Sequence, residues 1–220
     1  ALLGVAALRW SPGLGLAAAG VALVAGCGWV GGWALTRGWL PGHALLAVGI
    51  GLELDIPFKA IREGLSAYSG VYRRFELKGE AAGITVYDDY AHHPTEISAT
   101  LEGFKDSTQR RIVTLFQPHL FSRTRDLYAE FAKAFFSCDF LILAPIYPAR
   151  ELPIPGVNSQ LIANAAIQSG HHNIICLDSN AEIVPETLSR LEKGDILITM
   201  GAGNIWQYGE EILARLRENS

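Results

Sequence analysis

Short apolar runs alternate with amphipathic segments through the later part of the chain. The runs cover residues 111–116, 140–144, 173–177 and 196–200, and apolar side chains stand at nearly every position in them. Such runs are typical of strands that are buried on both faces of a parallel sheet. Helical spacing flanks them, over residues 94–105, 122–136, 159–168, 181–191 and 205–217. The pattern predicts a doubly wound α/β domain, with a mostly parallel sheet and helices on both of its faces.

A β-hairpin and two helices are expected before this alternation. Residues 71–78 and 84–90 have the character of two strands, joined by a turn around residues 79–83. Upstream, helical spacing covers residues 44–53, and a second amphipathic helix follows and ends near residue 69. The sheet domain is therefore preceded by helices.

The first part of the chain has a different character. Up to residue 52 the only formal charges are Arg9 and Arg37, and residues 13–35 form an uncharged run rich in Gly, Ala, Leu and Val. This run is long enough to span a bilayer, and a buried part of a larger domain would also be apolar. A third interpretation is a shifted reading frame or a misjoined gene start. We favour the third, because the family resemblance described below begins only after this part.

Composition narrows the possible partners. Half of the 220 residues are hydrophobic, 18% are charged, and the formal net charge is −4. Nucleic acid is not an expected partner, because phosphate binding needs a positively charged face. Cys27, Cys138 and Cys176 lie far apart and match no metal or redox spacing. We expect them to be small hydrophobic residues of a cytoplasmic protein, and we expect no metal ligands.

The loop after the strand at 84–90 carries a dense group of ionisable residues. It reads DDYAHHPTE from Asp88 to Glu96 and includes His92 and His93. Ligands of an open α/β sheet bind at the carboxyl ends of the strands, where this loop lies. A capped helix start with solvated histidines is the alternative. For so compact a cluster we favour a functional site.

The loop after the strand at 111–116 is the second candidate. It places Arg123 and Arg125 in the first turn of a helix, where cations are disfavoured by the helix dipole. A helix start with free N–H groups and arginines would bind a carboxylate. The alternative, which we rank second, is a surface pair between Arg125 and Asp126. The glycines of residues 200–204 are only a supporting feature.

Together these segments resemble the Mur ligases. The matching segments occur in the order of the family and read GLELDIPFKAIREGL at 51–65, RRFELKGE at 73–80, DDYAHHPTEI at 88–97, FQPHLFSRTRDL at 116–127 and MGAGNIW at 200–206. The DYAHxP core is general to the family. HHPTE combined with QPHxxSRTRD is similar to the branch that adds L-alanine. The resemblance covers the chain from about residue 45 to the C-terminus.

The resemblance implies an ATP-dependent, amide-forming ligase of peptidoglycan precursor synthesis. Its substrates would be UDP-N-acetylmuramate and L-alanine, and its cofactors ATP and Mg²⁺. ATP would phosphorylate the lactyl carboxylate, and the amino group of alanine would attack the resulting acyl phosphate. Such catalysis depends mainly on positioning and electrostatics.

The resemblance also assigns nucleotide contacts to residues of this sequence. Asp89 would bind the ribose of ATP, and Tyr90 would lie against the adenine. His92 would approach the phosphates. Arg74, in the segment that links the domains in this family, would also lie near the nucleotide.

The acceptor contacts implied by the resemblance lie in the second loop. His119 and Arg123 would face alanine and the muramoyl group, with Arg123 binding the carboxylate and Arg125 nearby. His92, His119 and Arg123 are thus the expected catalytic residues. Leu120 stands where some family members have an arginine, so alanine binding would depend more heavily on Arg123.

Parts of the family pattern do not occur in this sequence. It contains no G-K-T phosphate-binding loop, and nothing in it matches the family's UDP-binding domain or its magnesium ligands. We expect a non-family leader at residues 1–43, terminal helices of the central ATPase domain at 44–70, and the C-terminal domain at 71–220. The N-terminal and central domains would be its partners, with a membrane only if the leader is genuine. Alone, the chain should be inactive.

Other interpretations stay open. The chain could be a non-catalytic module that binds a nucleotide or substrate, tethered to a membrane by residues 13–35. It could instead resemble the ligase that recycles murein peptides, although that branch lacks QPHxxSRTRD. A nonfunctional gene remnant would leave the biochemical assignment of the domain unchanged.

Overall fold

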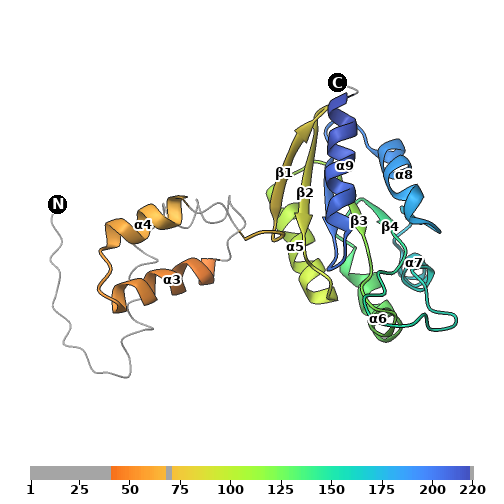
Figure 1. Ribbon diagram of the computed structural model, residues 1–220, viewed down its shortest axis with the longest axis horizontal. Coiled ribbons are helices and arrows are strands. Elements are labelled where there is room, and N and C mark those ends of the chain that lie inside the picture. Colours follow the sequence, from red (N-terminus) through yellow and green to blue (C-terminus); the bar gives the residue numbers. More distant parts are fainter. Residues whose placement is uncertain (1–40, 68–70, 219–220) are drawn as a thin grey trace. The chain divides into compact units, whose positions relative to one another are not determined.

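The computed structural model describes residues 41–67 and 71–218 (Figure 1). The chain divides into two compact units, residues 1–70 and 71–220, which are treated separately below. Of the expected leader, residues 1–43, only the last three belong to the described part, where they begin a helix. The interpretations offered for residues 13–35 concern residues outside the described part. Among the residues described, no helix combines the length and the apolar character that crossing a membrane requires.

The first unit contains two described helices, α3 (Pro41–Glu53) and α4 (Phe58–Ala67). The connection reverses through Asp55, which has a positive φ of 55°, and the Ile56 N–H donates to the Gly51 carbonyl at 2.9 Å. A Cβ atom on Gly51 would lie 2.7 Å from the Ile61 Cδ1 atom. Glycine therefore allows the two helices to approach closely at this point. Both expected helices are present.

The second unit is built on one six-stranded sheet. Its strand order is β1-β2-β6-β3-β4-β5, and every neighbouring pair is parallel except β1 with β2. The strands are β1 (Glu76–Ala81), β2 (Ile84–Asp89), β3 (Ile112–Phe116), β4 (Phe140–Leu143), β5 (Ile174–Cys176) and β6 (Ile196–Met200). The mostly parallel sheet and the entrance hairpin predicted from the sequence are confirmed.

Helices cover both faces of this sheet. They are α5 (Pro94–Ser107), α6 (Phe121–Ala134), α7 (Gln160–Gln168), α8 (Ile183–Arg190), which follows the short 3₁₀ turn η1 (Asn180–Glu182), and α9 (Ile205–Glu218). Buried side chains of α5, α6 and α7 share one cluster, and those of α8 and α9 share the other. The helix α9 packs against β1, β2 and β6, and Figure 1 shows it alongside β1 and β2.

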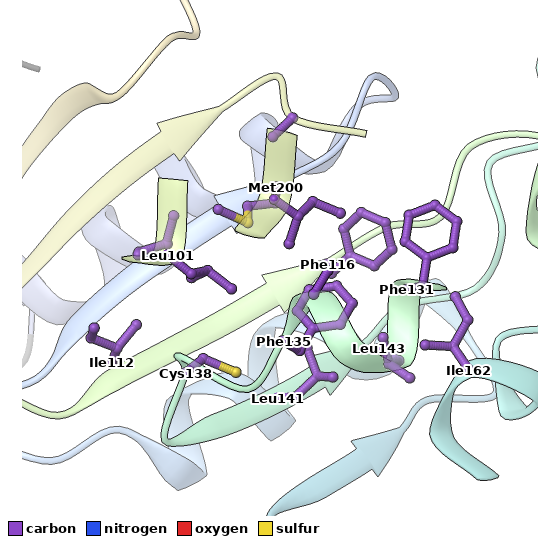
Figure 2. Packing of buried hydrophobic residues seen from close by; sticks show 14 of the residues in the cluster. Leu101, Ile112, Phe116, Phe131, Phe135, Cys138, Leu141, Leu143, Ile162 and Met200 are labelled. Atoms are coloured by element: carbon purple, nitrogen blue, oxygen red, sulfur yellow. The ribbon is translucent and has the colours of Figure 1, made fainter. Parts of the chain in front are cut away.

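Alternation along each buried strand divides the core into two layers. On β3, Ile112 and Phe116 belong to the layer with α5, α6 and α7, whereas Val113 and Leu115 belong to the layer with α8 and α9. All four side chains are fully buried. Successive side chains of a strand point to opposite faces, so a strand buried on both faces is apolar at nearly every position, and Thr114 is the one polar residue of β3. Figure 2 shows Phe116 among the aromatic side chains of the first layer.

The segment before β1 departs from the expected strand at 71–78. The strand begins only at Glu76, and Arg73 and Phe75 adopt positive φ angles of 55° and 52°. The segment folds back so that the Arg73 carbonyl accepts a hydrogen bond from the Tyr90 N–H at 2.7 Å. This irregular course places the Arg73 side chain in the interior, and the placement is incompatible with an extended strand.

The hairpin turn is also tighter than expected. It consists of Ala82 and Gly83 alone, with φ angles of 53° and 76°, and residues 79–81 belong to β1. Two consecutive positive φ angles match the twist of the flanking strands, which is the usual geometry of a two-residue hairpin loop. Gly79 lies at an irregularity in the β1–β2 register.

The carboxyl ends of four strands form one row. Asp89 pairs with Met200, Met200 with Phe116, and Phe116 with Leu143. The loops that follow β2, β6, β3 and β4 therefore leave the sheet at the same edge. The candidate site lies at this edge.

Candidate functional site

Four rings from three loops form a continuous row at the carboxyl edge of the sheet. The centroid of Tyr90 lies 5.2 Å from that of His92, and His92 lies 6.2 Å from His119. His119 in turn stacks on Tyr147 at 5.7 Å, with an interplanar angle of 13°. The row joins the loops after β2, β3 and β4. Three residues that the sequence assigned to the site, Tyr90, His92 and His119, are thus brought together.

The two histidines after β2 have different surroundings. His93 is exposed and caps α5: its Nδ1 accepts from the Thr95 N–H at 3.4 Å, while Glu96 accepts from the His93 N–H at 3.2 Å. His92 is turned to the ring row, and its Nδ1 lies 2.9 Å from the Tyr90 carbonyl oxygen. The interpretation as a helix cap therefore holds for His93, and His92 is the member of the pair that faces the site.

Asp89 is buried, and its carboxylate is occupied by protein donors. It accepts hydrogen bonds from the N–H groups of Ala91 at 2.8 Å and Phe75 at 3.2 Å, and from the Thr100 hydroxyl at 3.1 Å. Burial raises the pKa of Asp89, and these hydrogen bonds oppose the rise. In this structure Asp89 fixes the loop after β2. Since a carboxylate has about four acceptor positions, its role as a ribose ligand stays a prediction.

Arg73 is a buried residue of the site that the sequence did not indicate. Its Nε donates to Asp88 Oδ2 at 2.8 Å, and its two Nη atoms donate to the carbonyls of Gly203 at 3.1 Å and Gly201 at 2.6 Å. The guanidinium also lies 5.0 Å from the centre of the Tyr90 ring. Arg73 thus ties the segment before β1 to the loop after β6. The adjacent arginines of RRF were the one available signal, and they do not reveal which of the two is buried.

Arg74 lies at the surface next to Tyr90. Its side chain is 46% exposed, and its Nη1 is 3.4 Å from Glu96 and 3.9 Å from Asp89. Its guanidinium lies 5.5 Å from the centre of the Tyr90 ring, a partly exposed ring that Arg73 also approaches. Tyr90 and Arg74 are accessible, as a planar ligand would require.

The loop after β3 carries three buried polar atoms that have no hydrogen-bond partner in the described structure. They are Gln117 Oε1, His119 Nδ1 and Arg123 Nη1. An unpaired buried polar atom costs about 1–3 kcal/mol, and native proteins leave few of them. Three such atoms within seven residues indicate a place that a polar ligand completes. This loop therefore provides the polar centre of the site.

His119 lies among charged neighbours. Burial lowers its pKa, the positive charges of Arg123 and His92 lower it further, and Glu151 partly offsets the effect. The neutral imidazole is therefore favoured in the folded protein. A neutral imidazole can accept a hydrogen bond at one ring nitrogen.

The start of α6 differs from the vacant anion site expected from the sequence. Leu120 precedes the helix with a φ angle of 76° and provides no side-chain cap. The carboxylate of Glu151 takes that place, accepting from the Ser122 N–H at 2.9 Å and from the Ser122 hydroxyl. An anion of the chain itself thus satisfies the helix terminus. A substrate carboxylate would have to use the Arg123 side chain instead.

Arg125 lies apart from the buried atoms of this loop. Its Nε and Nη2 donate to the Asp126 carboxylate at 2.7 Å and 3.1 Å, and both side chains are more than half exposed. This is the surface pair that the sequence left as the second alternative. Substrate binding by Arg125 stays a prediction.

The glycines after β6 are required by close packing. Gly201 has a φ angle of 143°, and a Cβ on it would lie 2.7 Å from the Gln117 carbonyl oxygen. A Cβ on Gly203 would collide with Gln117 Oε1 and would lie 2.7 Å from the Tyr147 ring. The glycines allow the loop after β6 to approach the ring row.

Neither the acidic residues nor the described cysteines form a metal or redox centre. Within residues 41–67 and 71–218, no three His, Cys, Asp or Glu side chains are placed to hold a metal ion. Burial raises the pKa of the Cys138 thiol to about 12 and that of Cys176 to about 11. Both described cysteines are free thiols, and Cys27 lies outside the described residues.

Comparison with known proteins gives consistent relatives. The Mur ligase, glutamate ligase domain, matches residues 73–203. The chain is 48% identical over 176 residues to a UDP-N-acetylmuramate–L-alanine ligase of Geobacter sp. (strain M21) and 47% identical over 173 residues to one of Desulfosudis oleivorans. These alignments cover 80% and 78% of the chain but only 38% of each relative.

Solved structures share the fold. A UDP-N-acetylmuramate-alanine ligase of Thermotoga maritima aligns with a TM-score of 0.64 at 23% identity, over 80% of this chain and 37% of that one. A murein peptide ligase of Psychrobacter arcticus aligns with a TM-score of 0.57 at 26% identity, over 79% and 36%. Because the family's domain matches residues 73–203 of the 220, more than half of the sequence, this chain belongs to the Mur ligase family.

Proposed function

We propose that this chain is the acceptor domain of an ATP-dependent ligase that joins L-alanine to UDP-N-acetylmuramate in peptidoglycan precursor synthesis. The observation that carries the proposal is the pair of unpartnered buried atoms, His119 Nδ1 and Arg123 Nη1, in the loop that continues the ring row from His92. A carboxylate at Arg123 would satisfy one of them and neutralise a buried charge. The chain spans 38% of the length of the alanine ligases named above, and the other domains of the ligase are its proposed partners in the cytoplasm.

Each proposed role follows from the surroundings of the side chain. Arg123 would bind the carboxylate of the incoming amino acid. His119, whose pKa burial lowers, would accept a hydrogen bond from the acceptor or the muramoyl group. His92 would approach the phosphates between the two sites. Together these residues would hold two anions and an amine at reacting distance, which is the main requirement of amide formation from an activated acid.

The nucleotide would lie on the accessible side of Tyr90. The ring is 36% exposed and is flanked by the guanidinium groups of Arg73 and Arg74. A planar base stacks favourably on such a ring, and Arg74 adds a positive charge near the ribose and phosphates. ATP supplies the phosphoryl group that activates the substrate carboxylate. The phosphate-binding loop would come from the partner domain, as would the ligands of the proposed Mg²⁺.

L-alanine is favoured over a preformed peptide as the acceptor. The named relatives at 44–48% identity are alanine ligases. The QPHLFSRTRD loop from Gln117 to Asp126 supports the same choice, because its buried unpaired atoms suit a small charged ligand.

The first test is a titration of the purified chain with L-alanine, monitored by heteronuclear NMR. We expect saturable shifts at the backbone amides of His119 and Arg123. Arg123→Ala should abolish them, whereas Lys133→Ala should retain the affinity, because Lys133 is an exposed residue in the last turn of the same helix. Unchanged alanine binding in a folded Arg123→Ala variant would contradict the proposal. A tripeptide that begins with L-alanine and binds more tightly than L-alanine would favour the recycling ligase.

A further inference from the structure

Glu151 is an acidic residue in the middle of an otherwise cationic part of the site. It belongs to the loop between β4 and α7, and its side chain reaches the start of α6, 29 residues earlier in the chain. Its carboxylate accepts from the Ser122 N–H at 2.9 Å and from the Ser122 hydroxyl. The helix residue that would normally provide the cap is Leu120, whose side chain cannot accept a hydrogen bond. The cap is therefore supplied by a distant segment.

This placement brings charges of opposite sign near His119. The charge of Arg123 lowers the pKa of His119 and that of Glu151 raises it, so both charges lie near the ring. His119 is also held from the β4 side, where Tyr147 stacks on the ring and the Tyr147 carbonyl accepts from the Leu120 N–H at 3.0 Å. The loop that carries Glu151 is thus fixed to the acceptor loop at several points.

A second observation shows that the same place is incomplete. Gln117, which is only 1% exposed, has an unpartnered Oε1 next to the Tyr147 ring and Gly203. Arg123 Nη1 and His119 Nδ1 are also buried and unpartnered. The helix terminus itself is not part of this deficit, because Glu151 already satisfies it. A ligand bound here would therefore pair with the polar side chains of Gln117, His119 and Arg123, and not with the N–H groups at the helix start.

A free amino acid carries a negative carboxylate and a positive α-ammonium group, and the site offers a partner for each. Arg123 provides an unpaired donor for the carboxylate. The Glu151 carboxylate accepts from the Ser122 N–H, the Ser122 hydroxyl and the Phe121 N–H, which leaves about one of its roughly four acceptor positions for a ligand. We propose that Glu151 binds the α-ammonium group of the acceptor amino acid, opposite the carboxylate at Arg123. The inference rests on the proposed function, because it takes the ligand to be an amino acid.

This role differs from a purely structural cap in its dependence on charge. A helix cap needs an acceptor atom, which a glutamine amide also provides. An ammonium ligand needs the negative charge, because a charge-assisted hydrogen bond is roughly twice as strong as a neutral one. Glu151→Gln therefore separates the two roles.

The test compares L-alanine with propionate, which lacks the amino group, by NMR titration of the purified chain. We expect L-alanine to bind the wild type more tightly than propionate does. Glu151→Gln should weaken L-alanine binding about tenfold, corresponding to about 1.4 kcal/mol, and leave propionate binding unchanged. Glu182→Gln serves as the matched control, since Glu182 likewise caps a helical turn, η1, but lies in another loop.

The outcomes distinguish this inference from the proposed function. Equal loss of L-alanine and propionate binding in Glu151→Gln would mean that Glu151 only positions the loop, and would overturn the ammonium role. Unchanged L-alanine binding in that variant would overturn it as well, while the proposed function would stand if Arg123→Ala still abolishes binding. Equal affinity of the wild type for the two ligands would overturn the inference without any variant. If the wild type binds neither ligand, both proposals fail.

Discussion

Arg73 and Arg74 are neighbours in sequence with opposite surroundings. The Arg73 side chain is buried and donates to Asp88, Gly201 and Gly203, whereas that of Arg74 is 46% exposed. Asp88 is fully buried, and besides Arg73 it accepts from the Thr199 hydroxyl at 2.6 Å. Both arginines carry the same charge, so the contribution of each to the free energy of unfolding depends on how deeply it is buried.

Removing each arginine should therefore have unequal effects on stability. We expect Arg73→Ala to lower the free energy of unfolding by about 3–5 kcal/mol, because it leaves the Asp88 charge buried without its partner. Arg74→Ala should cost about 0–1 kcal/mol, since its ion pairs are exposed to solvent. Urea denaturation of both variants, followed by circular dichroism, measures the difference. Equal losses of unfolding free energy in the two variants would contradict the view that the buried Arg73 stabilises the fold more than Arg74 does.

At the scale of secondary structure, two helical glycines differ in the atoms that an added Cβ would contact. A Cβ on Gly209 of α9 would lie 2.9 Å from the Thr199 Cγ2 atom of β6, whereas a Cβ on Gly103 of α5 would meet nothing closer than Phe75 at 4.0 Å. Gly209 thus allows α9 to lie against the sheet, and Gly103 has no such role.

The same substitution should accordingly change stability in opposite directions. Gly103→Ala should raise the free energy of unfolding by about 0.5–1 kcal/mol through helix propensity. Gly209→Ala should lower it by about 1–2 kcal/mol, because overpacking exceeds that gain. Thermal and urea unfolding of the two variants test this. A stabilised Gly209→Ala variant would show that α9 can move away from β6 at little cost.

The accuracy of the sequence prediction also varied from element to element. The strands β3 and β6 were predicted well, because strands that are buried on both faces are apolar at nearly every position. The segment at residues 71–75 was predicted as strand and is irregular. Its conformation depends on contacts of Arg73 with Asp88 and with the loop after β6, which are distant in sequence.

For the molecule as a whole, the sheet domain carries the proposed acceptor residues, and no phosphate-binding loop of the G-K-T type occurs in the sequence. We therefore expect the purified 220-residue protein to show no alanine-dependent ATP hydrolysis. Release of phosphate, measured with and without L-alanine and UDP-N-acetylmuramate, tests this. Alanine-dependent hydrolysis by the chain alone would overturn the view that a partner domain supplies the nucleotide machinery.

The sequence by itself determined the class of fold, and it indicated the edge of the sheet at which the candidate site lies and most of the residues that meet there, because these depend on periodicity and on motifs that are continuous in the chain. Tyr90, His92, His119 and Arg123 could be named from two such motifs. Only the tertiary structure decided which of two adjacent arginines is buried, and that Glu151 occupies the start of α6. Both depend on side chains that meet across 15 to 130 residues of chain. Burial and pairing at such separations result from packing and leave no local pattern.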